Sequence, residues 1–268
     1  MTQAPIEDTR ALAALSSWRP AQLNDYLRDN RGSGVHIIDP FKVPLHEALA
    51  KARLVEDCGG RWLILASTDY HDFDEAMREY VPAVAASVSI PVLLHFPPTV
   101  GTGLPVVAGA AGYLWPALLR SNEPYFVWQS LLETVQHWSR VLPHDQWPEP
   151  VLCGAVTVGA DSRTGDLLGT DPLDESVESL RQLAAEIRRL GLDMVYLYSR
   201  NERVSLRTCS VLREELEPWQ IVFVSGNVRD ADTVRAYLDA GADYVGFAGA
   251  GEGTNWYETL PGLLAVTR

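Results

Sequence analysis

Two short segments near the C-terminus combine the residue types that bind phosphate. They are Ser225-Gly226-Asn227 and Ala248-Gly249, each directly after a short apolar run. Backbone N–H groups left bare at such strand ends bind phosphate oxygens. In eight-stranded β/α barrels, phosphate binds after the seventh and eighth strands. The sequence therefore favours a phosphate site over the alternative, in which the glycines only form tight turns.

Asp39 is the sharpest candidate for a metal ligand. It follows the apolar run 35–38 and precedes Pro40, so a barrel would hold its carboxylate rigidly at the mouth. Mg²⁺ in proteins is held by one or two carboxylates together with water and phosphate oxygens. The hydroxyl of Thr68, after the next apolar run, could join Asp39. We therefore expect Mg²⁺ as a cofactor, the alternative being that Asp39 caps the following helix.

Other polar side chains follow predicted strands and are candidates for substrate contacts. Lys42 could help to neutralise a diphosphate, and it joins Asp39 and Tyr196 as a candidate catalytic residue. His95 could be a base or a diphosphate donor, but a satisfied histidine at the barrel rim is an equal alternative. The candidates for binding a second substrate end the sixth predicted strand: Tyr196, Tyr198, Ser199, Arg200 and Asn201.

Aromatic residues cluster after an irregular segment. Residues 97–112 are rich in proline and glycine and cannot form a stable helix. The cluster that follows comprises Trp115, Tyr125, Phe126 and Trp128. Aromatic residues at helical spacing belong to a core more often than to a binding site. Their position beside a missing helix raises the other option, an apolar groove for a long ligand, with His95, Trp115 and Tyr125 as its contacts.

Strands and helices alternate along the chain. The predicted strands are residues 35–38, 62–66, 91–96, 113–115, 151–158, 194–198, 221–224 and 244–247, and helices are predicted between most of them. Residues 1–33 form an N-terminal helical segment. This pattern predicts one α/β domain over residues 1–268, a modified TIM (β/α)8 barrel whose third helix is missing.

The composition limits the classes of function. The chain has 268 residues and a net charge of −13, which disfavours nucleic acids and anionic membrane surfaces as partners. No apolar run is long enough to span a membrane, and we see no signal peptide. The three cysteines form no metal-binding or disulfide pattern, so a cytoplasmic protein is expected.

Five motifs resemble those of one enzyme family. VHIIDPFK, LASTD, VYLYSRN, FVSGN and GADYVGFAGA, spread over residues 35–250, are similar to motifs of geranylgeranylglyceryl phosphate synthases and their heptaprenyl relatives. The resemblance implies a TIM barrel that lacks its third helix. It also implies that Asp39 and Thr68 hold Mg²⁺, and that Ser225-Gly226-Asn227 and Ala248-Gly249 bind the phosphate of the acceptor.

Within the family, the motifs look closest to the branch that serves moenomycin-type phosphoglycolipid antibiotic biosynthesis. That resemblance implies an ether between an allylic diphosphate, farnesyl diphosphate, and the 2-hydroxyl of 3-phosphoglycerate. The alternative is a glycerol 1-phosphate prenyltransferase. A homodimer is an open option.

Two departures from the family pattern bear on the acceptor. Where the bacterial glycerol phosphate enzymes carry a lysine two residues before the aspartate, this chain has Ile37. The Tyr-Leu-Glu motif of the family reads Tyr-Leu-Tyr here, ending at Tyr198, and Arg200 replaces a small residue. Losing a carboxylate and gaining a guanidinium suits an acceptor that carries a carboxylate, which favours 3-phosphoglycerate and leaves the general base unassigned.

Two other functions remain as alternatives. A phosphosugar isomerase or aldolase would use the same phosphate segments, but it needs an acid–base pair or a Schiff-base lysine inside the barrel. The two lysines, Lys42 and Lys51, lie outside the predicted strands. A non-catalytic phosphoglycerate-binding regulator is the third possibility, and the presence of Asp39 and Thr68 argues against it.

Overall fold

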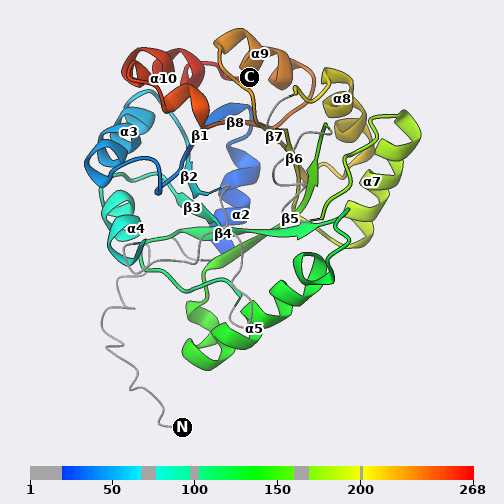
Figure 1. The fold of residues 1–268 in the computed structure, drawn as a ribbon, viewed down its shortest axis with the longest axis horizontal. Helices are drawn as coiled ribbons and strands as arrows, with labels where there is room; N and C mark the ends of the chain where they lie inside the picture. Colours follow the sequence, from blue (N-terminus) through cyan, green and yellow to red (C-terminus); the bar gives the residue numbers. More distant parts are fainter. Residues whose placement is uncertain (1–19, 68–76, 97–102, 160–168, 200–201) are drawn as a thin grey trace.

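Eight parallel strands close into a barrel, in the order of the sequence (Figure 1). The computed structural model describes residues 20–67, 77–96, 103–159, 169–199 and 202–268. The strands are β1 Ser33–Ile38, β2 Leu63–Ala66, β3 Val92–His95, β4 Gly112–Leu118, β5 Glu149–Thr157, β6 Met194–Tyr198, β7 Ile221–Ser225 and β8 Tyr244–Phe247. This architecture confirms the predicted TIM-type (β/α)8 barrel.

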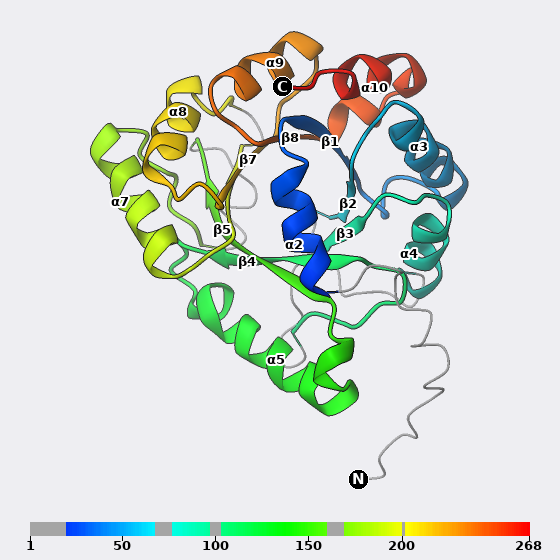
Figure 2. The same cartoon turned by 180° about the vertical axis from the view of Figure 1, so that it is seen from behind.

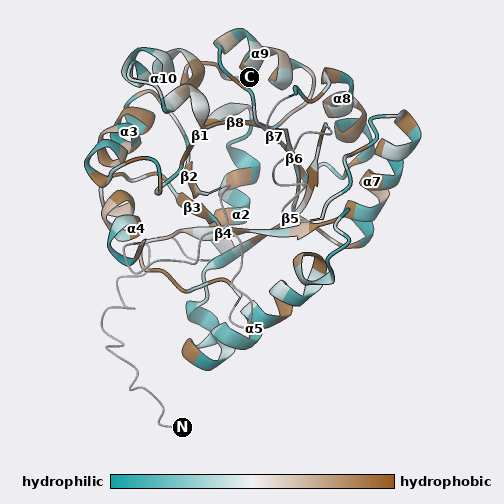
Figure 3. Cartoon of the chain, in the orientation of Figure 1, coloured by the Kyte–Doolittle hydropathy of each residue, from teal (hydrophilic) through white to brown (hydrophobic). Residues whose placement is uncertain are grey.

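Helices surround the barrel and bury the outer faces of its strands (Figure 1). The α-helices are α2 Pro20–Asp29, α3 Leu45–Asp57, α4 Met77–Ala86, α5 Ser130–Val141, α7 Val177–Arg189, α8 Leu206–Glu215, α9 Ala231–Asp239 and α10 Trp256–Leu264. Shorter turns are the π-helical η1 Tyr125–Gln129 and the 3-10 turns η2 His144–Gln146 and η3 Gly249–Gly251. Both faces of the strands are covered, so most strand residues are apolar, and β3 is coloured brown in Figure 3.

The helix α2 covers the N-terminal end of the barrel (Figure 2). Its Leu23 and Leu27 are fully buried, and Asn24 Nδ2 donates to Glu149 Oε1 at 2.9 Å at the start of β5. Tyr244 OH donates to Leu27 O at 2.5 Å. The N-terminal end is therefore closed by side chains, and a ligand must enter from the opposite end. Residues 1–19 of the predicted N-terminal segment lie outside the described part.

The segment between β3 and β4 is irregular where the structure describes it. Residues 103–111 contain no helix, and the prediction of a missing third helix stays a prediction for residues 97–102, which are not described. Leu104 N–H donates to Thr134 Oγ1 at 2.9 Å, and Trp138 Nε1 donates to Leu104 O at 2.8 Å. Side chains of α5 thus satisfy backbone groups that a helix would have satisfied internally.

The helical stretch between β4 and β5 opens with the π-helical turn η1. This turn begins after Pro124 and runs into α5, so the helical stretch ends at Val141. The extra residue in a π turn rotates the following side chains around the helix axis. No helix in the described ranges has both the length and the apolar character needed to cross a membrane.

Trp138 packs α5 against the barrel, and replacing it should destabilise the protein. The fully buried indole packs on Trp115 at 5.1 Å and on Tyr113 at 5.5 Å between ring centroids. We expect Trp138→Ala to lower the free energy of unfolding by about 3–5 kcal/mol, measured by urea denaturation. Trp128→Ala is the matched control because Trp128 is 46% exposed, so it should cost roughly 0.5 kcal/mol or less. Equal losses in the two variants would contradict this role for Trp138.

Candidate functional site

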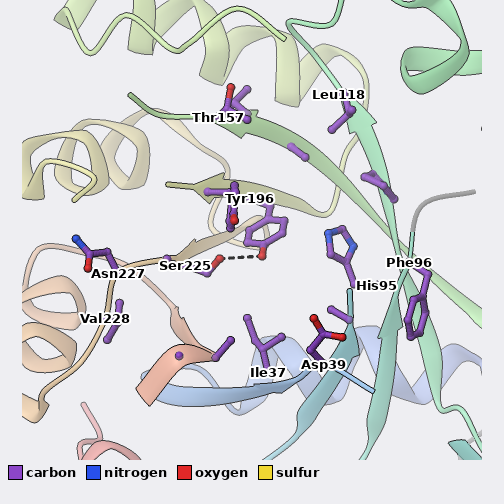
Figure 4. Close-up of a pocket in the computed structure, with 18 of the residues that line it drawn as sticks. Ile37, Asp39, His95, Phe96, Leu118, Thr157, Tyr196, Ser225, Asn227 and Val228 are labelled. Atoms are coloured by element: carbon purple, nitrogen blue, oxygen red, sulfur yellow. Dashed lines mark hydrogen bonds between the residues drawn. The ribbon is translucent and has the colours of Figure 1, made fainter. Parts of the chain in front are cut away.

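A cavity of about 320 Å³ opens at the C-terminal end of the barrel (Figure 4). Side chains that follow or end the strands line it, as expected for parallel strands whose carboxyl ends share one edge. Ten residues singled out from the sequence meet there: Asp39, Lys42, His95, Tyr196, Tyr198, Ser225, Gly226, Asn227, Ala248 and Gly249. Residues from β1, β3, β6, β7 and β8 thus converge on one space.

The carboxylate of Asp39 is buried and already oriented. Asp39 is 4% exposed, and its Oδ1 accepts a hydrogen bond from Phe41 N–H at 3.0 Å. Its Oδ2 lies 3.1 Å from Lys42 Nζ, which also lies 3.9 Å from Glu252 Oε1. The helix α3 begins only at Leu45, with Pro44 at its N-cap position, so Asp39 does not cap it.

The donor set at Asp39 fits a magnesium ion held mainly by water and phosphate oxygens. Among the described residues, no group of three or more His, Cys, Asp or Glu side chains could hold a metal by itself. One carboxylate is enough for Mg²⁺ when a substrate supplies phosphate oxygens. A metal at Oδ2 would have to displace the ammonium group of Lys42. Thr68, the second predicted ligand, lies outside the described residues.

Tyr196, Ser225 and His95 form a polar group in an otherwise apolar part of the cavity. Tyr196 OH and Ser225 Oγ share a hydrogen bond of 2.8 Å. The phenol ring stacks on Phe223, with centroids 4.8 Å apart, and the His95 ring meets it edge-on at 5.2 Å. Burial raises the pKa of Tyr196, so its hydroxyl stays protonated and can donate.

His95 is arranged to accept a proton. Its Nδ1 lies 3.3 Å from Leu114 O, and a carbonyl only accepts, so Nδ1 carries the proton. The Nε2 atom is then the acceptor, and Figure 4 shows the ring projecting into the cavity between Asp39 and Tyr196. Burial lowers the pKa of His95, which keeps the imidazole neutral near pH 7.

The loops after β7 and β8 present unpaired backbone N–H groups to the cavity. Gly226 has φ +98° and Asn227 has φ 54°, so two successive residues adopt the left-handed conformation. No acceptor within the described part of the chain takes the N–H groups of Gly226, Gly249 or Ala250. This geometry is suited to binding the oxygens of a phosphate group.

A buried histidine supports the loop after β8 from behind. His36 Nδ1 lies 3.1 Å from Phe247 O, and the two rings stack at 5.8 Å. A methyl group added to Gly251 would lie 2.3 Å from His36 Cε1, so the loop rests directly on the imidazole. Burial lowers the pKa of His36 to about 4, so the ring is neutral. His36 therefore lies on the face of β1 opposite to Ile37, which lines the cavity.

Three described residues that the sequence predicts as ligand contacts, Trp115, Tyr125 and Ser199, do not line the cavity. Trp115 is 4% exposed and packs outside the barrel on Trp138, because the cavity is lined by Pro116 and Leu118, which follow it along β4. At η1 the lining residue is Phe126 rather than Tyr125. The buried Ser199 lies behind Gly226. Arg200 and Asn201 are outside the described residues.

The sequence reading missed two charged residues and several apolar ones that line the cavity. Arg229 and Glu252 each continue a glycine-containing loop by a few residues. A prediction that extended each loop site as far as the next helix would have included both residues. The missed apolar residues include Ile37, Phe96, Pro116, Leu118 and Val156.

No protein-family model matches this chain, and no curated protein sequence does either. Its fold is similar to the (S)-3-O-geranylgeranylglyceryl phosphate synthase of Thermoplasma acidophilum, solved in complex with the substrate sn-glycerol-1-phosphate, with a TM-score of 0.77 at 20% identity over 91% of this chain and 97% of that one. The wild-type synthase of Thermoplasma volcanium has a TM-score of 0.76 at 19% identity, over 92% and 98% of the two chains.

A more distant structure is the thiamine phosphate pyrophosphorylase of Pyrococcus furiosus. It has a TM-score of 0.54 at 15% identity, covering 88% of this chain and 95% of that one. At such identities, the similarities establish a shared fold and leave the activity to the site residues.

The two loop glycines should respond differently to a methyl group. A Cβ atom on Gly226 would lie 1.6 Å from Ser199 O, whereas one on Gly249 would meet nothing within 4 Å. We expect Gly226→Ala to lower the free energy of unfolding by roughly 1–3 kcal/mol through backbone strain alone. The clash with Ser199 should lower it further. Gly249→Ala should unfold at the same urea concentration as the wild type. A stable Gly226→Ala protein would show that the loop conformation is not as described.

Proposed function

We propose that the protein is a prenyltransferase, which joins an allylic prenyl diphosphate to a phosphorylated three-carbon acceptor through an ether bond. The observation that carries the proposal is the meeting of two kinds of anion site at one apolar cavity. Bare N–H groups after β7 and β8 line it, and so do Asp39 and Lys42 after β1. The fold shared with two geranylgeranylglyceryl phosphate synthases supports the same reading.

The acceptor is held by its phosphate in this proposal. The N–H groups of Gly226, Gly249 and Ala250 bind the phosphate oxygens at the mouth of the cavity. The carbon chain then extends toward the interior, where Tyr196 OH can donate to one acceptor oxygen. His95 Nε2 takes the proton that the attacking hydroxyl group loses. This assigns the general base that the sequence left open.

The diphosphate of the donor binds near Asp39 in this proposal. The ammonium of Lys42, held 3.1 Å from Asp39 Oδ2, is placed to bind phosphate oxygens as they separate from the prenyl carbon. Mg²⁺ bound at Asp39 would neutralise the departing diphosphate and so favour ionisation of the allylic bond. Phe41 N–H fixes the rotation of the carboxylate, so little reorganisation is needed.

The walls of the cavity protect a reactive allylic carbon from water. Phe96, Leu118 and Phe126 line the side toward β3, β4 and η1. An allylic cation reacts with any water in contact with it, so a dry wall directs it to the bound acceptor hydroxyl. The prenyl chain would lie along this side of the cavity, where Figure 4 shows Phe96 and Leu118.

Two acceptors remain in the proposal, each supported by its own observation. Glycerol 1-phosphate is supported by the similar fold of the Thermoplasma acidophilum enzyme, solved with that substrate. The second candidate is 3-phosphoglycerate, used with farnesyl diphosphate. It is favoured by Tyr198, which lines the cavity where the resembled family has a glutamate, and by Arg200 in the sequence. A carboxylate-bearing acceptor would be repelled less by Tyr198 than by a glutamate.

Mass spectrometry of reaction products tests the function and separates the acceptors. The purified protein is incubated with Mg²⁺ and geranyl, farnesyl or geranylgeranyl diphosphate, against glycerol 1-phosphate, glycerol 3-phosphate or 3-phosphoglycerate. A prenyl ether that retains the acceptor phosphate is expected with one acceptor. Absence of an ether in every combination, together with no binding of any prenyl diphosphate, would refute the proposal.

The geometry disfavours an aldolase that uses a Schiff-base lysine. Lys51 lies on α3, is 1% exposed, and is paired with Glu47 at 2.6 Å. It is not among the residues that line the described cavity. Lys42 lies at the cavity mouth and is ion-paired with two carboxylates, whereas a Schiff-base lysine must present a free amine to a carbonyl group.

Asp39→Asn should abolish turnover while the acceptor still binds. The amide loses the charge that attracts both Mg²⁺ and Lys42, and we expect the rate to fall on the order of a thousandfold. Steady-state rates with and without Mg²⁺ measure the effect, and calorimetry measures acceptor binding. Asp57→Asn, at the exposed end of α3, is the control and should keep the wild-type rate. A nearly normal rate for Asp39→Asn would remove the carboxylate from the reaction.

A further inference from the structure

The charged residues that line the described cavity are two carboxylates and two cations, which are not paired one to one. They are Asp39, Lys42, Arg229 and Glu252. Lys42 lies 3.1 Å from Asp39 Oδ2 and 3.9 Å from Glu252 Oε1, so its charge is shared by two carboxylates. Arg229 forms no ion pair and no hydrogen bond with any residue that the structure describes. Its guanidinium is therefore available to an anion inside the cavity.

The backbone on both sides of Arg229 is fixed. Val228, which precedes it, is 3% exposed. Asp230, which follows it, caps α9 by accepting a hydrogen bond from Thr233 N–H at 2.7 Å. The other oxygen of Asp230 lies 3.7 Å from Arg203, so the neighbouring carboxylate already has a cation. Arg229 is thus held at the cavity rim while its side chain stays exposed.

A phosphate dianion needs more than neutral donors in this protein. The chain carries a net charge of −13, and its field repels anions from a distance. The N–H groups of Gly226, Gly249 and Ala250 supply direction but no full charge. A guanidinium binds phosphate through two parallel hydrogen bonds and keeps its charge at every working pH. Arg229 lies three residues beyond Gly226 on the same loop, which brings that charge to the phosphate side.

We propose that Arg229 binds the acceptor's phosphate and makes the site selective for phosphorylated acceptors. The assignment rests on the proposed function, because it places the acceptor phosphate at the loops after β7 and β8. Arg229 completes a site in which backbone N–H groups orient the phosphate and one guanidinium neutralises it. Lys42 and Asp39 then serve the diphosphate of the donor alone, so the two anions do not compete for one cation.

Binding of phosphorylated and unphosphorylated acceptors, measured by calorimetry, tests this assignment. The proteins are the wild type, Arg229→Gln, Arg229→Lys and Arg235→Gln, and the ligands are sn-glycerol 1-phosphate, 3-phosphoglycerate and glycerate. Arg235 is the matched control, because it is an exposed arginine on α9 that does not line the cavity. We expect Arg229→Gln to raise the Kd of both phosphate esters by about 10- to 100-fold, the scale of a charged hydrogen bond. The Kd values of Arg229→Lys should lie between those of the wild type and of Arg229→Gln. Arg235→Gln should bind both esters as the wild type does.

The outcomes separate this assignment from the proposed function. If the wild type binds neither phosphate ester, the acceptor site itself is refuted, and the assignment of Arg229 falls with it. If the wild type binds and Arg229→Gln binds equally well, Arg229 is refuted while the proposed function stands. A loss confined to 3-phosphoglycerate would assign Arg229 to the carboxylate and overturn the assignment to phosphate. Farnesyl diphosphate, as a further ligand, should bind Arg229→Gln as tightly as the wild type.

Discussion

The pairing of β1 with β8 closes the barrel, and the rest of the site depends on it. His36 lies opposite Phe247 in this parallel ladder, and its Nδ1 contacts the Phe247 carbonyl at 3.1 Å. The pairing brings Asp39, just after β1, to the same edge as Gly249, just after β8, although more than two hundred residues separate them. The proposed donor and acceptor sites can share one cavity only because this closure holds both strand ends at one mouth.

Charge is distributed over this mouth in a way that suits two anionic ligands. An acidic chain cannot attract a diphosphate or a phosphate through its overall field, so each must meet local donors. Lys42 and Asp39 form an ion pair. In the proposed function, Asp39 exchanges Lys42 for a metal, and Lys42 binds the diphosphate. The N–H groups after β7 and β8 form a second site of neutral donors, with Arg229 at its rim. The neutral side chains of Tyr196 and His95 lie between them, where the proposed allylic cation would form.

The sequence predicted the strand ends well because parallel strands bury both faces and end at polar residues. Asp39, Ser225 and Gly249 follow from that rule alone, and the structure places them together. The sequence could not predict which of two neighbouring aromatic or apolar residues faces the cavity, as Trp115 and Tyr125 show. A strand that is apolar on both faces has no alternation to read, and the π-helical turn before α5 rotates its side chains. Arg229 lies in a loop, where no periodicity marks the side that faces a ligand.

The central claim is that an acceptor oxygen attacks the prenyl carbon in this cavity. Isotope labelling tests it directly, with ¹⁸O in the hydroxyl groups of the preferred acceptor and mass spectrometry of both products. The account predicts that the ether retains the label and that the released diphosphate contains none, because the carbon–oxygen bond of the donor breaks. A labelled diphosphate joined to the acceptor, with free prenol, would place the attack at phosphorus and contradict the account.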